Sequence, residues 1–302
     1  MTKGLLNYFR LLKEAASEFS TDNVIKLSAS LAYYTVFSIG PLLLVIISFT
    51  GLFFEQEKIT GSIYQQMNNF IGPQGADQVL SIIRQMQQQN AAAKFSIIGI
   101  VLLIFGATGV FVDIQDSINY IWSIRAKPKK GWLKFLKNRM LSFSLIVGVG
   151  FLLIASLLIN TITDLLTDRL QQIFVDEAVI FFKILNIVIL FLITSILFTV
   201  IYKVLPDAYI HWKDALFGAT FTALLFLAGR FLIGIYLSKS EIANTYGAAA
   251  SIIIILSWVY YSSIILYFGA EFTKVYALSK GRAIRPNDTA VYIIKREAKE
   301  LP

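Results

Sequence analysis

Cysteine is absent from the chain, and histidine occurs once, as His211. The lack of cysteine excludes disulfides, thiolate metal sites and cysteine nucleophiles. A single histidine excludes His-rich metal clusters and most histidine-based acid–base catalysis. Charged residues are also scarce: they make up 15% of the 302 residues, while 56% are hydrophobic. Soluble domains have about 25% charged residues, so this composition disfavours a soluble protein and excludes disorder.

Long apolar runs take the place of the missing polar residues. A bilayer core about 30 Å thick requires about 20 apolar residues of helix, and the runs here are apolar around the whole helix rather than along one stripe. We therefore predict an all-α, polytopic integral membrane protein with six transmembrane helices and short amphipathic interfacial helices. The predicted spans cover residues 27–54, 95–124, 141–163, 178–202, 214–237 and 247–276.

The remaining segments complete a single membrane domain over residues 1–302. Residues 1–23 have apolar side chains at helical spacing with charges between them, which predicts an amphipathic helix on the membrane surface. A six-helix bundle follows over residues 27–276, with an outward loop at 55–94. Residues 277–302 form the predicted cytoplasmic tail.

Lysine and arginine are distributed unevenly between the predicted loops. The two termini and the loops on their side carry 20 of these residues, and the opposite loops carry 5. Cytoplasmic loops are enriched in Lys and Arg, and an even number of spans places both termini on one side. The sequence therefore predicts a cytoplasmic membrane protein with cytoplasmic N- and C-termini.

The predicted inner loop at 125–139 is basic and contains Trp132 and Phe135. An interfacial helix against anionic lipid headgroups accounts for this mixture. A nucleic-acid patch is the alternative, but aromatic and basic residues are expected beside membrane spans, so we predict lipid rather than nucleic-acid partners.

Charged residues within predicted spans are candidates for function. Asp113 and Asp116 lie late in the second span, on one predicted helical face, and two interpretations stay open: an interfacial position or a cation or proton site. Arg230 lies in the fifth span, where it either extends to the interface or faces the bundle to bind an anionic headgroup or a carboxylate such as Asp113. Glu271 ends the sixth span and predicts an interfacial ion pair with Lys274.

Two further features predict helix packing. Gly40-Pro41 in the first span should kink or break that helix. A stripe of small residues on the fifth span permits close helix contact. Its members are Ala215, Ala219, Thr222 and Ala223.

Three blocks of sequence resemble the YihY / virulence factor BrkB family. They are LAYYTVFSIGPLLLVIIS in the first span, YKVLPDAYIHWKDALFGA at 202–219 and TYGAAASIIIILSWVYYSSIILYFGAEF at 245–272. The resemblance covers roughly residues 20–280 and implies a bacterial inner-membrane protein with six spans. The matching positions are Tyr33, Tyr34, Pro41, Leu205, Pro206, Asp214, Ala215, Tyr246, Gly247, Trp258, Gly269, Ala270 and Glu271.

The resemblance suggests a role in the cell envelope and in handling or transporting lipid. The family has also been labelled ribonuclease BN, but one histidine and no cysteine cannot make a zinc site, and the scattered acids make no obvious magnesium site. We therefore predict no enzymatic activity and no cofactor, and a transporter-like or lipid-handling protein. The alternative is a non-catalytic scaffold that binds an envelope protein or a second copy of the chain. No phosphate-binding G-x-x-x-x-G-K-[ST] motif is present.

Overall fold

The computed structural model describes residues 2–50, 97–127, 177–239 and 250–295, together with a few isolated positions between 60 and 84. The third predicted span at 141–163 lies outside these residues. So do most of the outer loop at 55–94 and most of the basic loop at 125–139.

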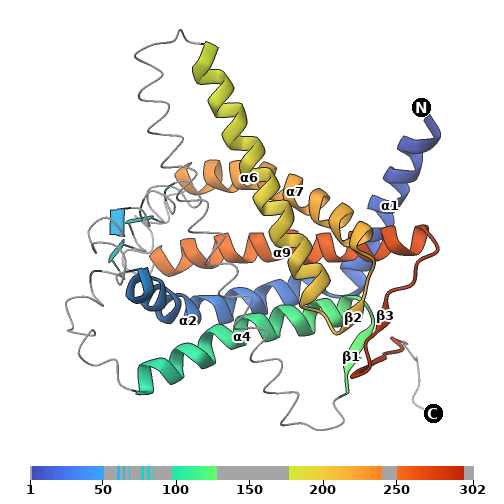
Figure 1. Ribbon diagram of the computed structural model, residues 1–302, viewed down its shortest axis with the longest axis horizontal. Coiled ribbons are helices and arrows are strands. Elements are labelled where there is room, and N and C mark those ends of the chain that lie inside the picture. The colour runs from blue at the N-terminus through green and yellow to red at the C-terminus, as the bar shows by residue number, and fades with distance from the viewer. Residues whose placement is uncertain are drawn as a thin grey trace.

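Helices account for most of the described chain, and long ones coincide with five of the six predicted spans (Figure 1). Four short strands lie between or after them. The helices are α1 (Thr2–Thr21), α2 (Val24–Thr50), α4 (Ile97–Ile121), α6 (Glu177–Val204), α7 (Trp212–Lys239) and α9 (Ala250–Ser279). The strands are β1 (Ile124–Ala126), β2 (Ala208–Tyr209), β3 (Arg285–Pro286) and β4 (Ala290–Tyr292).

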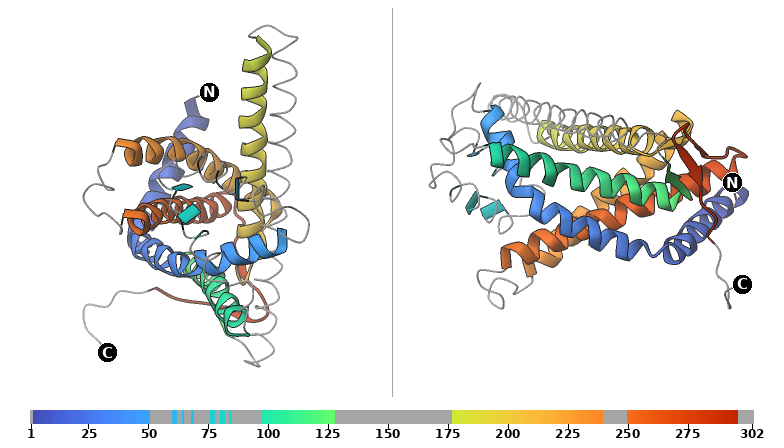
Figure 2. Two further views of the ribbon diagram at one scale, coloured as in Figure 1. Left: turned by 90° about the vertical axis from the view of Figure 1, so that its left-hand side faces the viewer. Right: turned by 90° about the horizontal axis from the view of Figure 1, so that it is seen from below.

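The long helices pack side by side in the order α6, α7, α9, α2, α4. The helix α9 therefore lies in the middle, between α7 on one side and α2 on the other (Figure 1). The helix α6 runs at a steep angle to the others and extends beyond them (Figures 1 and 2). This order places α4 and α6 at opposite edges of the row.

Large apolar side chains cover the exposed faces of this row. Ile187, Leu192 and Ile196 of α6 and Phe231 and Leu232 of α7 are all more than half exposed. An apolar surface of this extent is typical of contact with lipid. Among the described residues, three helices are long and apolar enough to cross a membrane, through the stretches Ile187–Val204, Trp212–Ile233 and Ile252–Ser279. The prediction of helical membrane architecture is thus supported, while the total of six spans stays a prediction.

The amphipathic helix α1 differs from the prediction in what it contacts. Its apolar side packs on α9 rather than lying only on lipid. Ala15 is fully buried against Phe272 and Val275. The rings of Phe19 and Phe268 pack edge to face, with their centroids 5.7 Å apart. The predicted helix is thus present and packs on the aromatic face of α9, while its position on the membrane surface stays a prediction.

The strands pair as two small antiparallel ladders. The register joins Arg125 of β1 to Val291 of β4, and Tyr209 of β2 to Arg285 of β3. The start of the basic loop, predicted as an interfacial helix, is therefore a strand up to Ala126. The described part of the predicted cytoplasmic tail crosses the ends of α4 and α6 and pairs with the segments that follow them.

The two packing predictions have different outcomes. The helix α2 continues without interruption through Gly40-Pro41. It bends in its second half (Figure 2), so the proline position lies in a bent helix and not in a break. The small-residue stripe on α7 is confirmed, because Ala215, Ala219, Thr222 and Ala223 are all completely buried.

Candidate functional site: the charged end of the helix row

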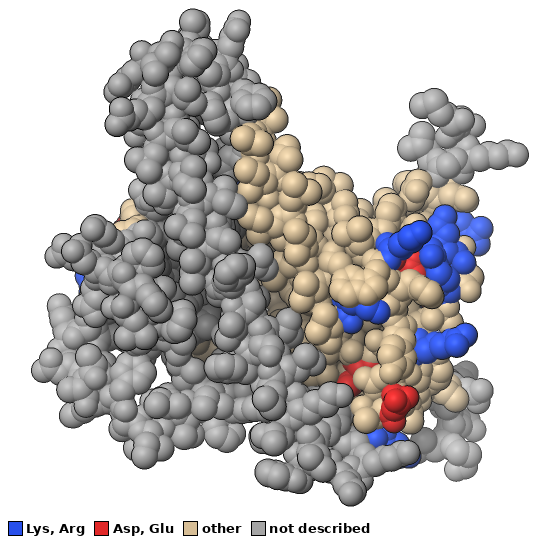
Figure 3. Space-filling model, viewed as in Figure 1, with Lys and Arg blue, Asp and Glu red and all other residues tan. Residues whose placement is uncertain are grey.

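Most of the ion pairs of the described residues lie at one end of the helix row. The helices α4, α6 and α9 end there, α2 and α7 begin there, and the strands lie across it (Figure 1). Figure 3 shows Lys and Arg side chains gathered at this side, beside a surface of other residues over the helices. We call this region the charged end.

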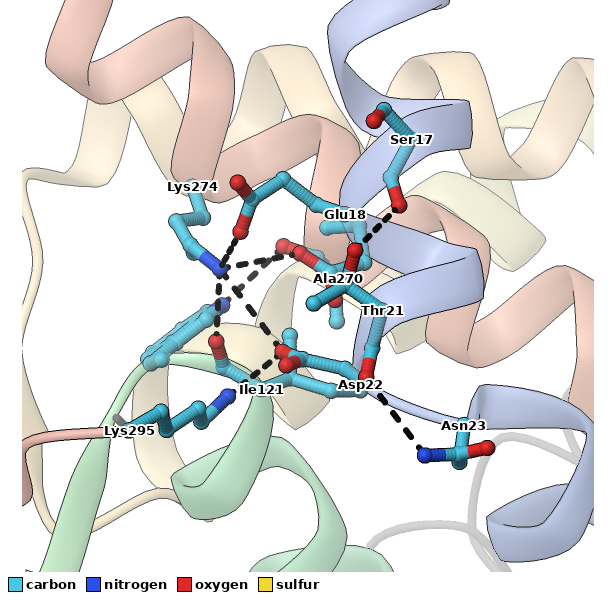
Figure 4. Close-up of polar contacts among 11 residues, drawn as sticks. Ser17, Glu18, Thr21, Asp22, Asn23, Ile121, Ala270, Lys274 and Lys295 are labelled. Atoms are coloured by element: carbon cyan, nitrogen blue, oxygen red, sulfur yellow. Dashed lines mark hydrogen bonds and ion pairs between the residues drawn. The ribbon is translucent and has the colours of Figure 1, made fainter. Parts of the chain in front are cut away.

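A group of five charged residues, which we call the Lys274 cluster, joins distant parts of the chain at the charged end. Its members are Glu18 of α1, Asp22 after α1, Glu271 and Lys274 of α9, and Lys295 after β4. The Nζ of Lys274 donates to Glu18 Oε2 at 2.9 Å, to Glu271 Oε2 at 3.2 Å and to the carbonyl oxygen of Ile121 at 2.9 Å (Figure 4). Lys295 Nζ donates to Asp22 Oδ2 at 2.6 Å.

Burial distinguishes this cluster from a surface ion pair. Glu271 has no exposed surface, and Asp22 is 2% exposed. The predicted pair of Glu271 with Lys274 exists at 3.2 Å, and α1 and the tail cover it, so it is buried within the protein at the charged end. The three carboxylates bring one oxygen each within 4.8 Å of one another, a spacing that could hold a metal ion. The ammonium of Lys274 already lies within 3.8 Å of all three, so the cluster has its own cation.

A second group, which we call the Asp207 hub, ties α4 to the turn between α6 and α7. Gln115 Nε2 and Asn119 Nδ2 donate to Asp207 Oδ2 at 3.2 and 3.1 Å. The backbone N–H of Asp207 donates back to Asn119 Oδ1 at 2.8 Å. Asn287 of the tail donates to Asp207 Oδ1 at 3.3 Å, so the hub joins three segments. A carboxylate with this many donors is well satisfied despite its burial.

A cavity of about 590 Å³ opens beside the hub, and we call it the basic pocket. Its walls are the turn between α6 and α7 and the segment after α9. The residues that carry its chemistry are Lys203, Tyr209, His211, Trp212, Arg282 and Arg285. Arg282 Nη2 lies 2.8 Å from Asp214 Oδ1, and Asp214 is almost completely buried at the start of α7.

A polar group also lies within the helix row, around Asp113. Ser30 of α2 donates to Asp113 Oδ1 at 2.8 Å. Tyr267 of α9 interacts with both Asp113 and Ser117, and the charge of Asp116 also acts on Asp113. Asp113 Oδ2 and the Tyr267 hydroxyl are buried but meet no hydrogen-bond geometry within the described residues. Buried polar atoms of this kind require an explanation, since nearly all such groups in proteins are paired.

The other predicted charges are placed differently from Asp113. Asp116 is exposed one turn away on α4, and its charge acts on Asp113, so their joint role stays a prediction. Arg230 is half-buried on α7, which contacts α6 and α9, whereas α4 contacts α2 and α9. Arg230 lies eighteen residues from the charged end of α7 and Asp113 eight from that of α4. At 1.5 Å per residue these are depths of about 27 and 12 Å. The order of the helices also places the middle helix α9 between Asp113 and Arg230.

The family-motif positions have varied surroundings. Tyr33 and Tyr34 are exposed on α2, where the centroids of their rings lie 5.9 Å apart. Pro206 is buried beside the Asp207 hub, and the ring of Trp258 meets that of Phe226. At Gly269, a Cβ atom would overlap the hydroxyl oxygens of Thr222 and Tyr202, so close packing of α9 on α7 explains the glycine. Tyr246 and Gly247 lie outside the described residues.

Several residues of the charged end were missed by sequence reasoning. Gln115 and Asn119 were not among the candidate residues, yet both are buried partners of Asp207. Their spacing of four residues places them on one helical side, and Asp207 falls within the block at 202–219 that resembles the family. Glu18, Asp22 and Lys295 gave no signal, because their roles depend on contacts across more than 250 residues.

These features define a class: a helical membrane protein whose apolar row of helices ends in a buried network of charges. Comparison of the sequence with protein families gives the particular family. The model of the family described as virulence factor BrkB matches residues 15–291. The chain belongs to this family.

Individual relatives agree with this assignment. The UPF0761 membrane protein of Pseudomonas aeruginosa (strain LESB58) is 30% identical over 259 residues, which are 84% of this chain and 60% of that protein. The one from Azotobacter vinelandii is 30% identical over 93% of this chain and 65% of its own length. The one from Vibrio vulnificus (strain YJ016), VV0203, is 27% identical over 90% of this chain and 83% of its own length. The chain thus spans less than two thirds of the first two relatives. No solved structure gives a significant match.

Proposed function

We propose that this membrane protein moves or presents a lipid or another amphipathic solute in the bacterial inner membrane, with its charged end in the cytoplasm. The orientation rests on the excess of Lys and Arg in the segments on that side. The proposal includes no catalytic step and no cofactor.

The observation that carries the proposal is the Asp113 group. A carboxylate at membrane depth is costly and marks the path of an ion, a proton or a substrate more often than it serves stability. Here Ser30 fixes one carboxylate oxygen, while the Tyr267 hydroxyl interacts with Asp113 in a buried position and neither it nor the second oxygen meets full hydrogen-bond geometry within the described part of the chain. Contributions from α2, α4 and α9 mean that a polar group bound here would contact three helices of the row.

Reconstitution tests this function directly. Purified protein in liposomes should speed the exchange of NBD-labelled phosphatidylglycerol between leaflets, measured by the fraction of label that dithionite bleaches. Asp113→Asn should slow the exchange at least tenfold, because it removes the charge and keeps the shape. Asp116→Asn is the matched control: it changes an exposed acid one turn away and should leave the exchange unchanged. Exchange no faster than in empty liposomes, or equal loss in both variants, contradicts the proposal.

The structure removes one possible argument for the scaffold alternative. A stripe of small residues can also serve contact with a partner, but the stripe on α7 is completely buried within the chain. Chemical crosslinking in membranes still separates the two functions, since a scaffold should give a stoichiometric product with an envelope protein or with a second copy.

A further inference from the structure

The basic pocket has an uncompensated positive charge. Lys203, Arg282 and Arg285 line it, and its lining contains no acidic residue. Asp214 neutralises one of these charges through its ion pair with Arg282. Two charges, on Lys203 and Arg285, therefore remain in a cavity at the end of the helix row.

The walls of the pocket are held in place before any ligand binds. Tyr209 of β2 pairs with Arg285 of β3, which joins the two walls directly. The backbone N–H of Asn287 donates to the carbonyl oxygen of Asp207 at 3.0 Å and secures the same junction beside it. Lys203 Nζ donates to the carbonyl oxygen of Ile210 and lies 5.5 Å from the ring centre of Trp212. Fixed donors of this kind lower the entropic cost of binding.

The shape and setting of the pocket indicate the class of ligand. Its volume of about 590 Å³ lies in the range of ligand cavities, about 300–1,000 Å³. Tyr209 and Trp212 are exposed aromatic residues at the end of an apolar helix, where such side chains lie at headgroup level. Arg282 Nε is buried and has no hydrogen-bond acceptor within the described residues.

From these observations we infer that the basic pocket binds a phosphate group, carried by a lipid headgroup or by a free phosphate. Arginine matches the geometry of phosphate oxygens, and lysine supplies a point charge. Asp214 holds Arg282 in position, while Lys203 and Arg285 provide the charge that the ligand neutralises. This binding is independent of transport and holds whether or not the Asp113 group moves a solute.

The test uses the full chain in neutral detergent. Tryptophan emission reports binding, because Trp212 lines the pocket. Dioctanoyl phosphatidic acid should bind at least tenfold more tightly than dioctanoyl phosphatidylcholine, and added salt should weaken its binding. Glycerol 3-phosphate in a separate titration distinguishes the sources: binding of the lipid alone identifies a headgroup, and binding of both identifies the phosphate itself as sufficient.

Matched variants assign the binding to the pocket. Lys203→Gln with Arg285→Gln removes two charges from the pocket, whereas Lys213→Gln with Lys280→Gln removes two charges from exposed residues at the same end and outside the pocket. The first double variant should bind phosphatidic acid at least tenfold more weakly, and the second should bind as the unchanged protein does. Equal affinity in both, or no preference for phosphatidic acid, overturns the inference. The thermal midpoint of each variant shows whether it is folded.

Discussion

At the scale of single residues, Lys274 has the most demanding position in the described chain. Its side chain is 13% exposed and lies among three carboxylates that come from α1, the turn after it and α9. A buried ion pair contributes little net stability compared with apolar packing, but loss of one partner leaves uncompensated charge. Lys274 therefore serves to fix how these segments meet.

Lys274→Met should lower the free energy of unfolding by about 3 kcal/mol, because Glu271 would stay buried without its cation, while Asp22 keeps Lys295. Chemical unfolding in detergent measures this change. Lys280→Met removes an exposed lysine just beyond α9 and should change stability by less than about 0.5 kcal/mol. Similar losses in both variants would mean that Lys274 acts through overall charge and not through the cluster.

Gly269 is the second residue with a specific steric role. Tyr202 donates to the carbonyl oxygen of Leu266 at 2.7 Å and lies 3.0 Å from the Thr222 hydroxyl. Both oxygens occupy the space that a Cβ at position 269 would need. Gly269→Ala should therefore destabilise the protein by about 2 kcal/mol, the usual cost of overpacking. Gly61→Ala, at a position with open space around it, is the control for thermal unfolding and should unfold at the original temperature.

At the scale of elements, the tail after α9 lies across the charged end and holds its segments together. We call this part of the tail, with its contacts, the clasp. It pairs with β1 through β4 and with β2 through β3, and it joins the Asp207 hub through Asn287. The turn between α6 and α7 therefore depends on α4 and on the tail for its position. The basic pocket depends on the same contacts, since its two walls are this turn and this tail.

Asn119→Ala should loosen this clasp. The substitution removes two hydrogen bonds to Asp207, one of them to its carboxylate, at a cost of about 2 kcal/mol. Hydrogen exchange should quicken at residues 205–211 and 285–292, while the middle of α9 keeps its protection. Asp288→Ala, an exposed change in the tail, should leave exchange in both segments as before. Unchanged exchange in Asn119→Ala would show that the strand pairs hold the clasp without the hub.

The accuracy of sequence reasoning also differs between elements. Apolar length predicted the positions of α2, α4, α6, α7 and α9 well, because helices in a membrane satisfy their own backbone hydrogen bonds. The short strands and the Lys274 cluster could not be predicted. They depend on pairing between residues far apart in the chain, as between Arg125 and Val291, and no local pattern records such contacts.

At the scale of the whole molecule, the segments rich in Lys and Arg in the sequence are the ones that the fold brings together at the charged end. The segments that the positive-inside count assigns to the cytoplasm include α1, β1, the turn between α6 and α7, and the tail, and all of these meet at the charged end. The count uses no structural information, so this agreement supports the proposed orientation. The third predicted span at 141–163 is the part of the topology on which the even number of spans depends.

Cysteine labelling tests this topology without background, because the chain contains no cysteine of its own. An impermeant maleimide added to intact spheroplasts should label Gly61→Cys and leave Asp288→Cys unlabelled until the membrane is opened, since the first lies in the predicted outer loop and the second in the tail. Lys130→Cys and Arg169→Cys flank the third predicted span and should behave as inner and outer positions. If residue 169 were protected like residue 130, no span would separate them. The number of spans would then be odd, and Gly61 and Asp288 could not both give the expected result unless another crossing had been assigned incorrectly.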